Sequence, residues 1–110
     1  MIKIFDLKEQ YKQFGSIIDK KVLNILSSGN YILGKNVTTF EENARDYLKS
    51  KYTISCNSGT DALVLSLRAL GIKSGDEVIT TPFSYFATAE SISLTGAKPV
   101  FADINPHTYN

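Results

Sequence analysis

The sequence is poor in the residues that build disulfides and metal sites. Its 110 residues include one cysteine, Cys56, and one histidine, His107. A single cysteine excludes an internal disulfide and fits a reducing compartment, so the sequence predicts a cytoplasmic protein. One cysteine and one histidine are too few for a zinc site. Because Cys56 lies in a short apolar stretch, we expect its thiol to be ordinary core.

The sequence also lacks a strong charge bias and a long apolar run. The formal net charge is +1, which indicates neither a nucleic-acid partner nor a membrane surface. No apolar run is long enough to span a bilayer, and we expect no signal peptide. The GxGxxG and GxxxxGKS/T patterns are both absent, which excludes a Rossmann fingerprint and a Walker loop. With 43% hydrophobic and 21% charged residues, the composition is that of a globular protein.

The first fifty residues predict two helices. Asp6 precedes apolar residues that recur at helical spacing, so we expect it to cap a helix that ends near Ser28 and Gly29. Residues 29–34 include two glycines and predict a connector. A second helix is expected to begin near Thr38. Residues 1–50 are therefore expected to form a helical lead-in.

From Lys51 onward, strands and helices are predicted to alternate. Short β-prone runs cover residues 52–56, 77–81 and 99–102, and helices are expected over 61–70 and 84–95. This β-α-β-α-β order is typical of a doubly wound α/β layer with crossover helices, so residues 51–110 are expected to begin an α/β sheet. In such sheets ligands bind beyond the carboxyl ends of the strands.

Two loops occupy such positions. Ser58, Gly59 and Thr60 stand between the first predicted strand and its helix, where two hydroxyls, a glycine and a helix start together suit a phosphate. The simpler interpretation is that Ser58 or Thr60 only caps the helix. The loop 82–86 holds three aromatic residues, of which at most one is expected to stack on a ligand. A phosphate site beside an aromatic ring suits a phosphorylated aromatic cofactor such as pyridoxal phosphate.

Several short segments occur along the chain in the order of one known enzyme family. They are Asp6-Leu7-Lys8, residues 29–34 with Phe40-Glu41, residues 57–63, residues 70–72, residues 75–79, residues 87–90, and residues 96–101 with Asp103. On these segments the chain resembles the DegT/DnrJ/EryC1/StrS family of pyridoxal-phosphate-dependent sugar aminotransferases. The resemblance implies the amino-terminal part of the fold type I (aspartate aminotransferase-like) large domain.

The resemblance also implies a site for pyridoxal 5'-phosphate. Ser58, Gly59 and Thr60 match the family's phosphate-binding turn, and Tyr85 matches the aromatic residue that stacks on the pyridine ring. Asp61 matches a helix-start residue and not a catalyst. In the family, the Schiff-base lysine and the aspartate that pairs with the pyridine nitrogen lie beyond residue 110. No catalytic residue is therefore assigned to this chain.

The implied reaction is transfer of an amino group, typically from glutamate, to a keto sugar carried by a nucleotide. Gly29 and Tyr31 match a loop that contacts the nucleotide sugar. The family's enzymes are several times longer and are expected to be homodimers. We therefore expect the chain to be the amino-terminal piece of such an enzyme, either a natural truncation or an incomplete sequence, and to be inactive alone. Two alternatives remain: a sugar dehydratase of the same family, and a stand-alone protein that binds a phosphorylated ligand without catalysis.

The family's strand order leads to one further expectation. In that fold, later strands fill the space between the strand over 52–56 and the strands over 77–81 and 99–102. We therefore expect the last two to pair with each other, and the first to stand apart from them or to pair in another way.

Overall fold

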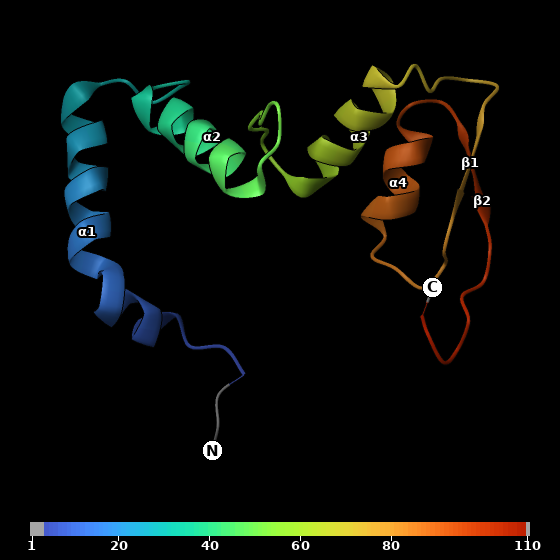
Figure 1. The fold of residues 1–110 in the computed structure, drawn as a ribbon, viewed down its shortest axis with the longest axis horizontal. Coiled ribbons are helices and arrows are strands. Elements are labelled where there is room, and N and C mark those ends of the chain that lie inside the picture. Colours follow the sequence, from blue (N-terminus) through green and yellow to red (C-terminus); the bar gives the residue numbers. More distant parts are fainter. Residues whose placement is uncertain (1–3, 110) are drawn as a thin grey trace. The chain divides into compact units, whose positions relative to one another are not determined.

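The computed structural model describes residues 4–109. Within these residues the elements follow in the order α1 (Leu7–Ser28), α2 (Lys35–Leu48), α3 (Gly59–Ala69), β1 (Glu77–Thr80), α4 (Ala87–Ser93) and β2 (Lys98–Phe101) (Figure 1). The chain divides into two units, of which the first ends at Ile54 and the second begins at Ser55. None of the helices over 4–109 is both long and apolar enough to cross a membrane.

Helix α1 begins and ends where the sequence predicts. The Asp6 carboxylate accepts hydrogen bonds from the backbone N–H groups of Lys8 and Glu9, at 3.1 and 3.3 Å. Gly29 ends the helix with a left-handed φ of 69°, which glycine adopts without a steric penalty. The predicted cap and stop signals are both confirmed.

Helix α2 begins at Lys35, earlier than the predicted start near Thr38. Gly34 precedes it in an extended conformation, and the Gly34 carbonyl accepts hydrogen bonds from the N–H groups of Val37 and Thr38, at 2.9 and 3.4 Å. No side chain caps this helix. A prediction that depends on a serine or threonine cap therefore places its start too late.

The second unit is built on a pair of parallel strands. Strands β1 and β2 pair with Glu77 opposite Lys98 and Thr80 opposite Phe101. Helix α4 connects them and packs on both strands and on α3. The core is small because, in the described residues, α4 is the one helix that packs on the strand pair; its buried side chains are Val64, Ala87, Ser91, Ile92 and Ala97. The strands predicted over 77–81 and 99–102 do pair with each other, as expected.

The predicted strand over 52–56 is absent, so that part of the prediction was wrong. These residues have no regular secondary structure and join neither β1 nor β2. An extended segment becomes a strand only when its N–H and C=O groups have a ladder partner. Cys56 is exposed as a consequence, and the prediction that its thiol lies in the core is also wrong. The observed order of this unit is α3-β1-α4-β2.

Within α1, the ring of Tyr11 lies over Gly15. A Cβ atom at Gly15 would come within 3.0 to 3.2 Å of three Tyr11 ring carbons. The Tyr11 hydroxyl donates to both carboxylate oxygens of Asp19, at 2.8 and 2.7 Å. The hydrogen bond to Asp19, the loss of water around the phenol and the charge of Asp19 raise the pKa of Tyr11.

Replacing the carboxylate by an amide tests this arrangement. Asp19→Asn is expected to lower the pKa of Tyr11 toward its ordinary value of 10.0, because a neutral amide no longer disfavours the phenolate. An alkaline titration of the tyrosine ring carbons followed by NMR measures this pKa. Asp46→Asn on α2 is the control, because the Asp46 carboxylate pairs with Arg45 and not with Tyr11; this variant should leave the pKa of Tyr11 raised. An unchanged pKa of Tyr11 in Asp19→Asn would contradict the observed hydrogen bond.

The exposed apolar side chains predict how residues 1–110 behave when expressed alone. Leu7, Phe14 and Val22 on α1 and Leu65 on α3 are all exposed, and such surface promotes association. We expect self-association and no cooperative unfolding transition. Amide exchange should be fast at 52–56, which lacks ladder bonds, and slower in β1 and β2. A monomer with cooperative unfolding and protected amides at 52–56 would be inconsistent with this view.

Candidate functional site

The turn at residues 58–60 forms the N-terminus of α3. Ser58 is the N-cap residue, and its hydroxyl accepts a hydrogen bond from the Asp61 N–H at 3.1 Å. The same hydroxyl donates to the Asp61 carboxylate at 2.9 Å. The Ser58 carbonyl accepts a hydrogen bond from the Ala62 N–H at 3.0 Å. The side chain of Ser58 is thus engaged in capping, which is the simpler of the two interpretations of this residue.

The first two residues of α3 keep their polar groups available. In the part of the chain that the structure describes, the N–H groups of Gly59 and Thr60 and the Thr60 hydroxyl have no hydrogen-bond acceptor. A Cβ atom at Gly59 would meet nothing within 4 Å, so a ligand can approach the backbone closely. Since a helix N-terminus carries partial positive charge, these groups would suit an anion such as phosphate.

The loop between β1 and α4 holds the three predicted aromatic residues. The ring of Phe83 stacks on that of Tyr109, with centroids 6.2 Å apart and planes 26° apart. Tyr85 and Phe86 are 82% and 74% exposed. Both line a cavity of about 290 Å³, here called the aromatic cavity, whose other lining residues are Thr81, Pro82, Ser84, Thr88, Ala89 and Phe101. All three rings are therefore exposed, Phe83 to 70%, and Phe83 differs in stacking on another ring.

The turn and the aromatic cavity lie at the same edge of the second unit. Strands β1 and β2 are parallel, and Figure 1 shows both α3 and α4 running in the opposite direction to them. The N-termini of the two helices therefore lie at the carboxyl ends of the strands, where open α/β sheets bind ligands. The lining of the aromatic cavity does not include Ser58, Gly59 or Thr60.

Gly29 and Tyr31 lie in the first unit, in the connection between α1 and α2. The Tyr31 hydroxyl donates to the Leu26 carbonyl at 3.1 Å, while its ring is 66% exposed. Gly29 provides the left-handed turn that leads into the connection. The hydroxyl is therefore held by the end of α1, and the ring face is accessible.

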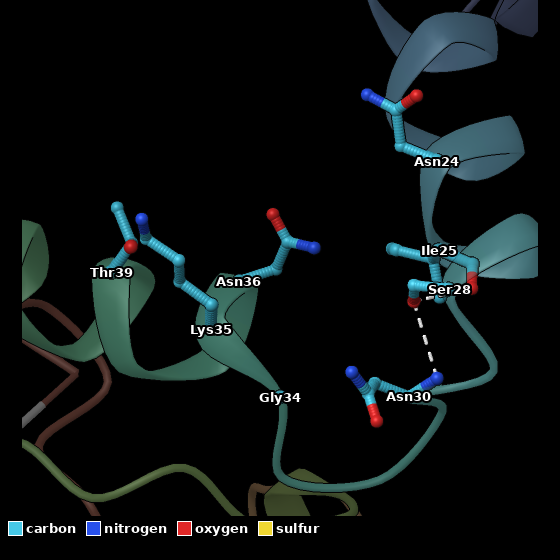
Figure 2. A pocket seen from close by; sticks show the side chains of 8 residues that line it. All are labelled: Asn24, Ile25, Ser28, Asn30, Gly34, Lys35, Asn36 and Thr39. Atoms are coloured by element: carbon cyan, nitrogen blue, oxygen red, sulfur yellow. Dashed lines mark hydrogen bonds between the residues drawn. The ribbon is translucent and has the colours of Figure 1, made fainter.

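A pocket of about 300 Å³, here called the amide pocket, lies beside this connection (Figure 2). Its lining residues are Asn24, Ile25, Ser28, Asn30, Gly34, Lys35, Asn36 and Thr39. The Asn30 N–H donates to the Ser28 hydroxyl oxygen at 3.2 Å, shown as a dashed line in Figure 2. Sequence reasoning missed this pocket, although three asparagines spaced six residues apart could have drawn attention to it. Gly29 and Tyr31 are not part of its lining.

Comparison with known proteins supports the family that the sequence resembles. A sequence model of the DegT/DnrJ/EryC1/StrS aminotransferase family matches residues 13–110. The UDP-2-acetamido-2-deoxy-3-oxo-D-glucuronate aminotransferase of Pseudomonas aeruginosa is 50% identical over 110 residues, which are 100% of this chain and 31% of that protein. The chain thus spans less than a third of the length of this relative.

Solved structures give the same result for the fold. A DegT DnrJ EryC1 StrS aminotransferase from Brucella abortus superposes with a TM-score of 0.93 at 36% identity, covering 99% of this chain and 29% of that one. NtdA from Bacillus subtilis, solved with the cofactor PMP bound, superposes with a TM-score of 0.80 at 37% identity, covering 83% of this chain and 21% of that one. The predicted fold is therefore confirmed as the amino-terminal part of the fold type I large domain. The chain belongs to the DegT/DnrJ/EryC1/StrS aminotransferase family.

Proposed function

We propose that this chain forms the cofactor-phosphate-binding part of a pyridoxal-phosphate-dependent aminotransferase that acts on a nucleotide-linked keto sugar. The observation that carries the proposal is the start of α3, where Gly59 and Thr60 hold unpaired donors, together with the exposed ring of Tyr85 in the loop before α4. Membership of the family supports the reaction class. The 50% identical relative is named as an aminotransferase of a 3-oxo sugar nucleotide, which supports the substrate class. Glutamate is proposed as the amino donor.

The residues of the turn fit the phosphate of pyridoxal 5'-phosphate. The two N–H groups and the Thr60 hydroxyl supply three donors to an anion, and hydrogen bonds to charged groups are stronger than those between neutral groups. Ser58 holds the turn through Asp61, 2.9 Å from its hydroxyl. To donate to the phosphate as well, the Ser58 hydroxyl would have to leave that carboxylate. We assign the main donors to Gly59 and Thr60, and include Ser58 in the site.

Tyr85 fits the aromatic part of the cofactor. Its ring is exposed, and no hydrogen bond holds its hydroxyl in the described part of the chain. One face of the ring can therefore lie flat on a planar ligand and limit its tilt. The bound cofactor supplies the electron sink that amino-acid side chains lack. We propose that residues of the complete enzyme outside this chain supply the lysine, so residues 1–110 alone should not catalyse transamination.

Gly29 and Tyr31 are proposed as contacts to the nucleotide sugar. The support is the accessible Tyr31 ring, whose hydroxyl is fixed by the Leu26 carbonyl at 3.1 Å. The neighbouring amide pocket offers side-chain amides and Lys35, which suit a polar and negatively charged molecule. A homodimer is proposed for the complete enzyme, because α1 exposes apolar residues along its length. A cytoplasmic location is proposed from the single cysteine.

Removing the Thr60 hydroxyl tests the phosphate site. Thr60→Val in the complete enzyme is expected to weaken binding of pyridoxal phosphate by about tenfold to a hundredfold, because a hydrogen bond to a charged group contributes roughly 1.5–3 kcal/mol. Titration of the apoenzyme, followed by cofactor absorbance, measures the affinity. Thr38→Val on exposed α2 is the matched control and should bind normally. If Thr60→Val binds pyridoxal phosphate with wild-type affinity, Thr60 has a structural role only.

Tyr85 is tested by separating its ring from its hydroxyl. Tyr85→Ala should loosen the cofactor by about threefold to tenfold, since ring stacking contributes on the order of 0.5–1.5 kcal/mol. Tyr85→Phe keeps the ring and should bind almost normally. The same titration compares the two variants, with Tyr85→Phe as the matched control. Equal losses in both variants would show that the hydroxyl matters and would reject the stacking role.

A further inference from the structure

Helix α3 is attached to its unit through α4. Among the helices and strands over 4–109, α3 packs on α4 and on neither β1 nor β2, whereas α4 packs on both strands. The buried residues of the two helices are few: Val64 on α3, and Ala87, Ser91 and Ile92 on α4. The position of the turn at 58–60 relative to Tyr85 therefore depends mainly on how α3 packs on α4.

Arg68 connects the two helices at their C-terminal ends. Its Nη2 donates to the carbonyl of Leu94 at 3.2 Å, across 26 residues of sequence. Arg68 lies in the last turn of α3, and Leu94 is the C-cap of α4. Because both helix ends carry partial negative charge, a guanidinium between them stabilises both and reduces their mutual repulsion. No other side-chain hydrogen bond joins α3 to α4 in the described residues.

A second contact closes the same end of the helix pair. Gly96 follows α4 with a φ of +86°, and a Cβ atom there would come within 3.3 Å of the backbone nitrogen and Cβ of Ser74. The Lys98 N–H donates to the Asp76 carbonyl at 2.9 Å. The segments that follow α3 and α4 are thus in contact. Arg68 lies in the last turn of α3, next to this contact.

We propose that Arg68 is a positioning residue for the cofactor site. By fixing the C-terminal ends of α3 and α4, it sets the separation of their N-terminal ends. Gly59 and Thr60 lie at the N-terminal end of α3, and Tyr85 lies just before the N-terminal end of α4. The two ends would therefore hold the two parts of one cofactor. Helix α3 has 11 residues and is therefore about 16 Å long. A small rotation of α3 about its C-terminal end, at Arg68, therefore displaces the turn at 58–60. The inference rests on the proposed function.

Substitutions of Arg68 in the complete enzyme test this inference. Arg68→Met keeps an unbranched apolar stem but removes the guanidinium donors, and should weaken pyridoxal phosphate binding by the apoenzyme on the order of threefold to tenfold. The visible circular dichroism of the bound cofactor should change, because its orientation changes. Arg68→Lys should restore part of the affinity, since an ammonium group can still donate. Arg45→Met, on α2, is the matched control, because Arg45 pairs with its neighbour Asp46 at 2.9 Å; it should bind normally.

Three outcomes would overturn the inference. In the first, Arg68→Met lowers the melting temperature but keeps wild-type affinity and circular dichroism, which would leave Arg68 a structural role only. In the second, Arg45→Met and Arg68→Met lose affinity equally. In the third, Arg68→Lys binds no better than Arg68→Met. A wild-type enzyme that binds no pyridoxal phosphate would overturn the proposed function, and this inference with it.

Discussion

The packing of α4 holds the second unit together. This short helix contacts β1, β2 and α3, and it contributes Ala87, Ser91 and Ile92 to a core that contains few other buried side chains. A parallel strand pair requires such a crossover, because its two strands cannot be joined by a tight turn. The same helix thus closes the sheet and supports the helix that carries the candidate phosphate site.

The start of α3 combines a side-chain cap with unpaired backbone donors. Every helix leaves its first N–H groups without partners inside the helix. Here the Ser58 hydroxyl accepts a hydrogen bond from the N–H of Asp61. The N–H groups of Gly59 and Thr60, which lie between these two residues, have no acceptor in the described chain. Gly59 leaves the approach open. The observed cap and the proposed phosphate donors are therefore on adjacent residues, and the two interpretations of this turn do not exclude each other.

In the described residues of the first unit, the helices bury no apolar side chain of their own. Apolar residues recur along α1 at helical spacing, yet most of them are exposed, and Gly15 is its buried residue. Such a stripe normally faces a packing partner. The relatives that match this chain are more than three times its length, so they contain further chain against which such a stripe could pack. Local signals alone were sufficient to form the helices, because caps and spacing act within a few residues.

The sequence alone determined the features that depend on neighbouring residues. Asp6 and Gly29 define α1, Ser58 starts α3, and the strand runs after Gly75 and Gly96 are where they were predicted. Tertiary structure decided what depends on distant partners. Residues 52–56 have no ladder partner and form no strand, Phe83 packs on Tyr109, and Arg68 reaches Leu94 across 26 residues. Periodicity and capping cannot predict these contacts, because each requires two segments that only the folded chain brings together.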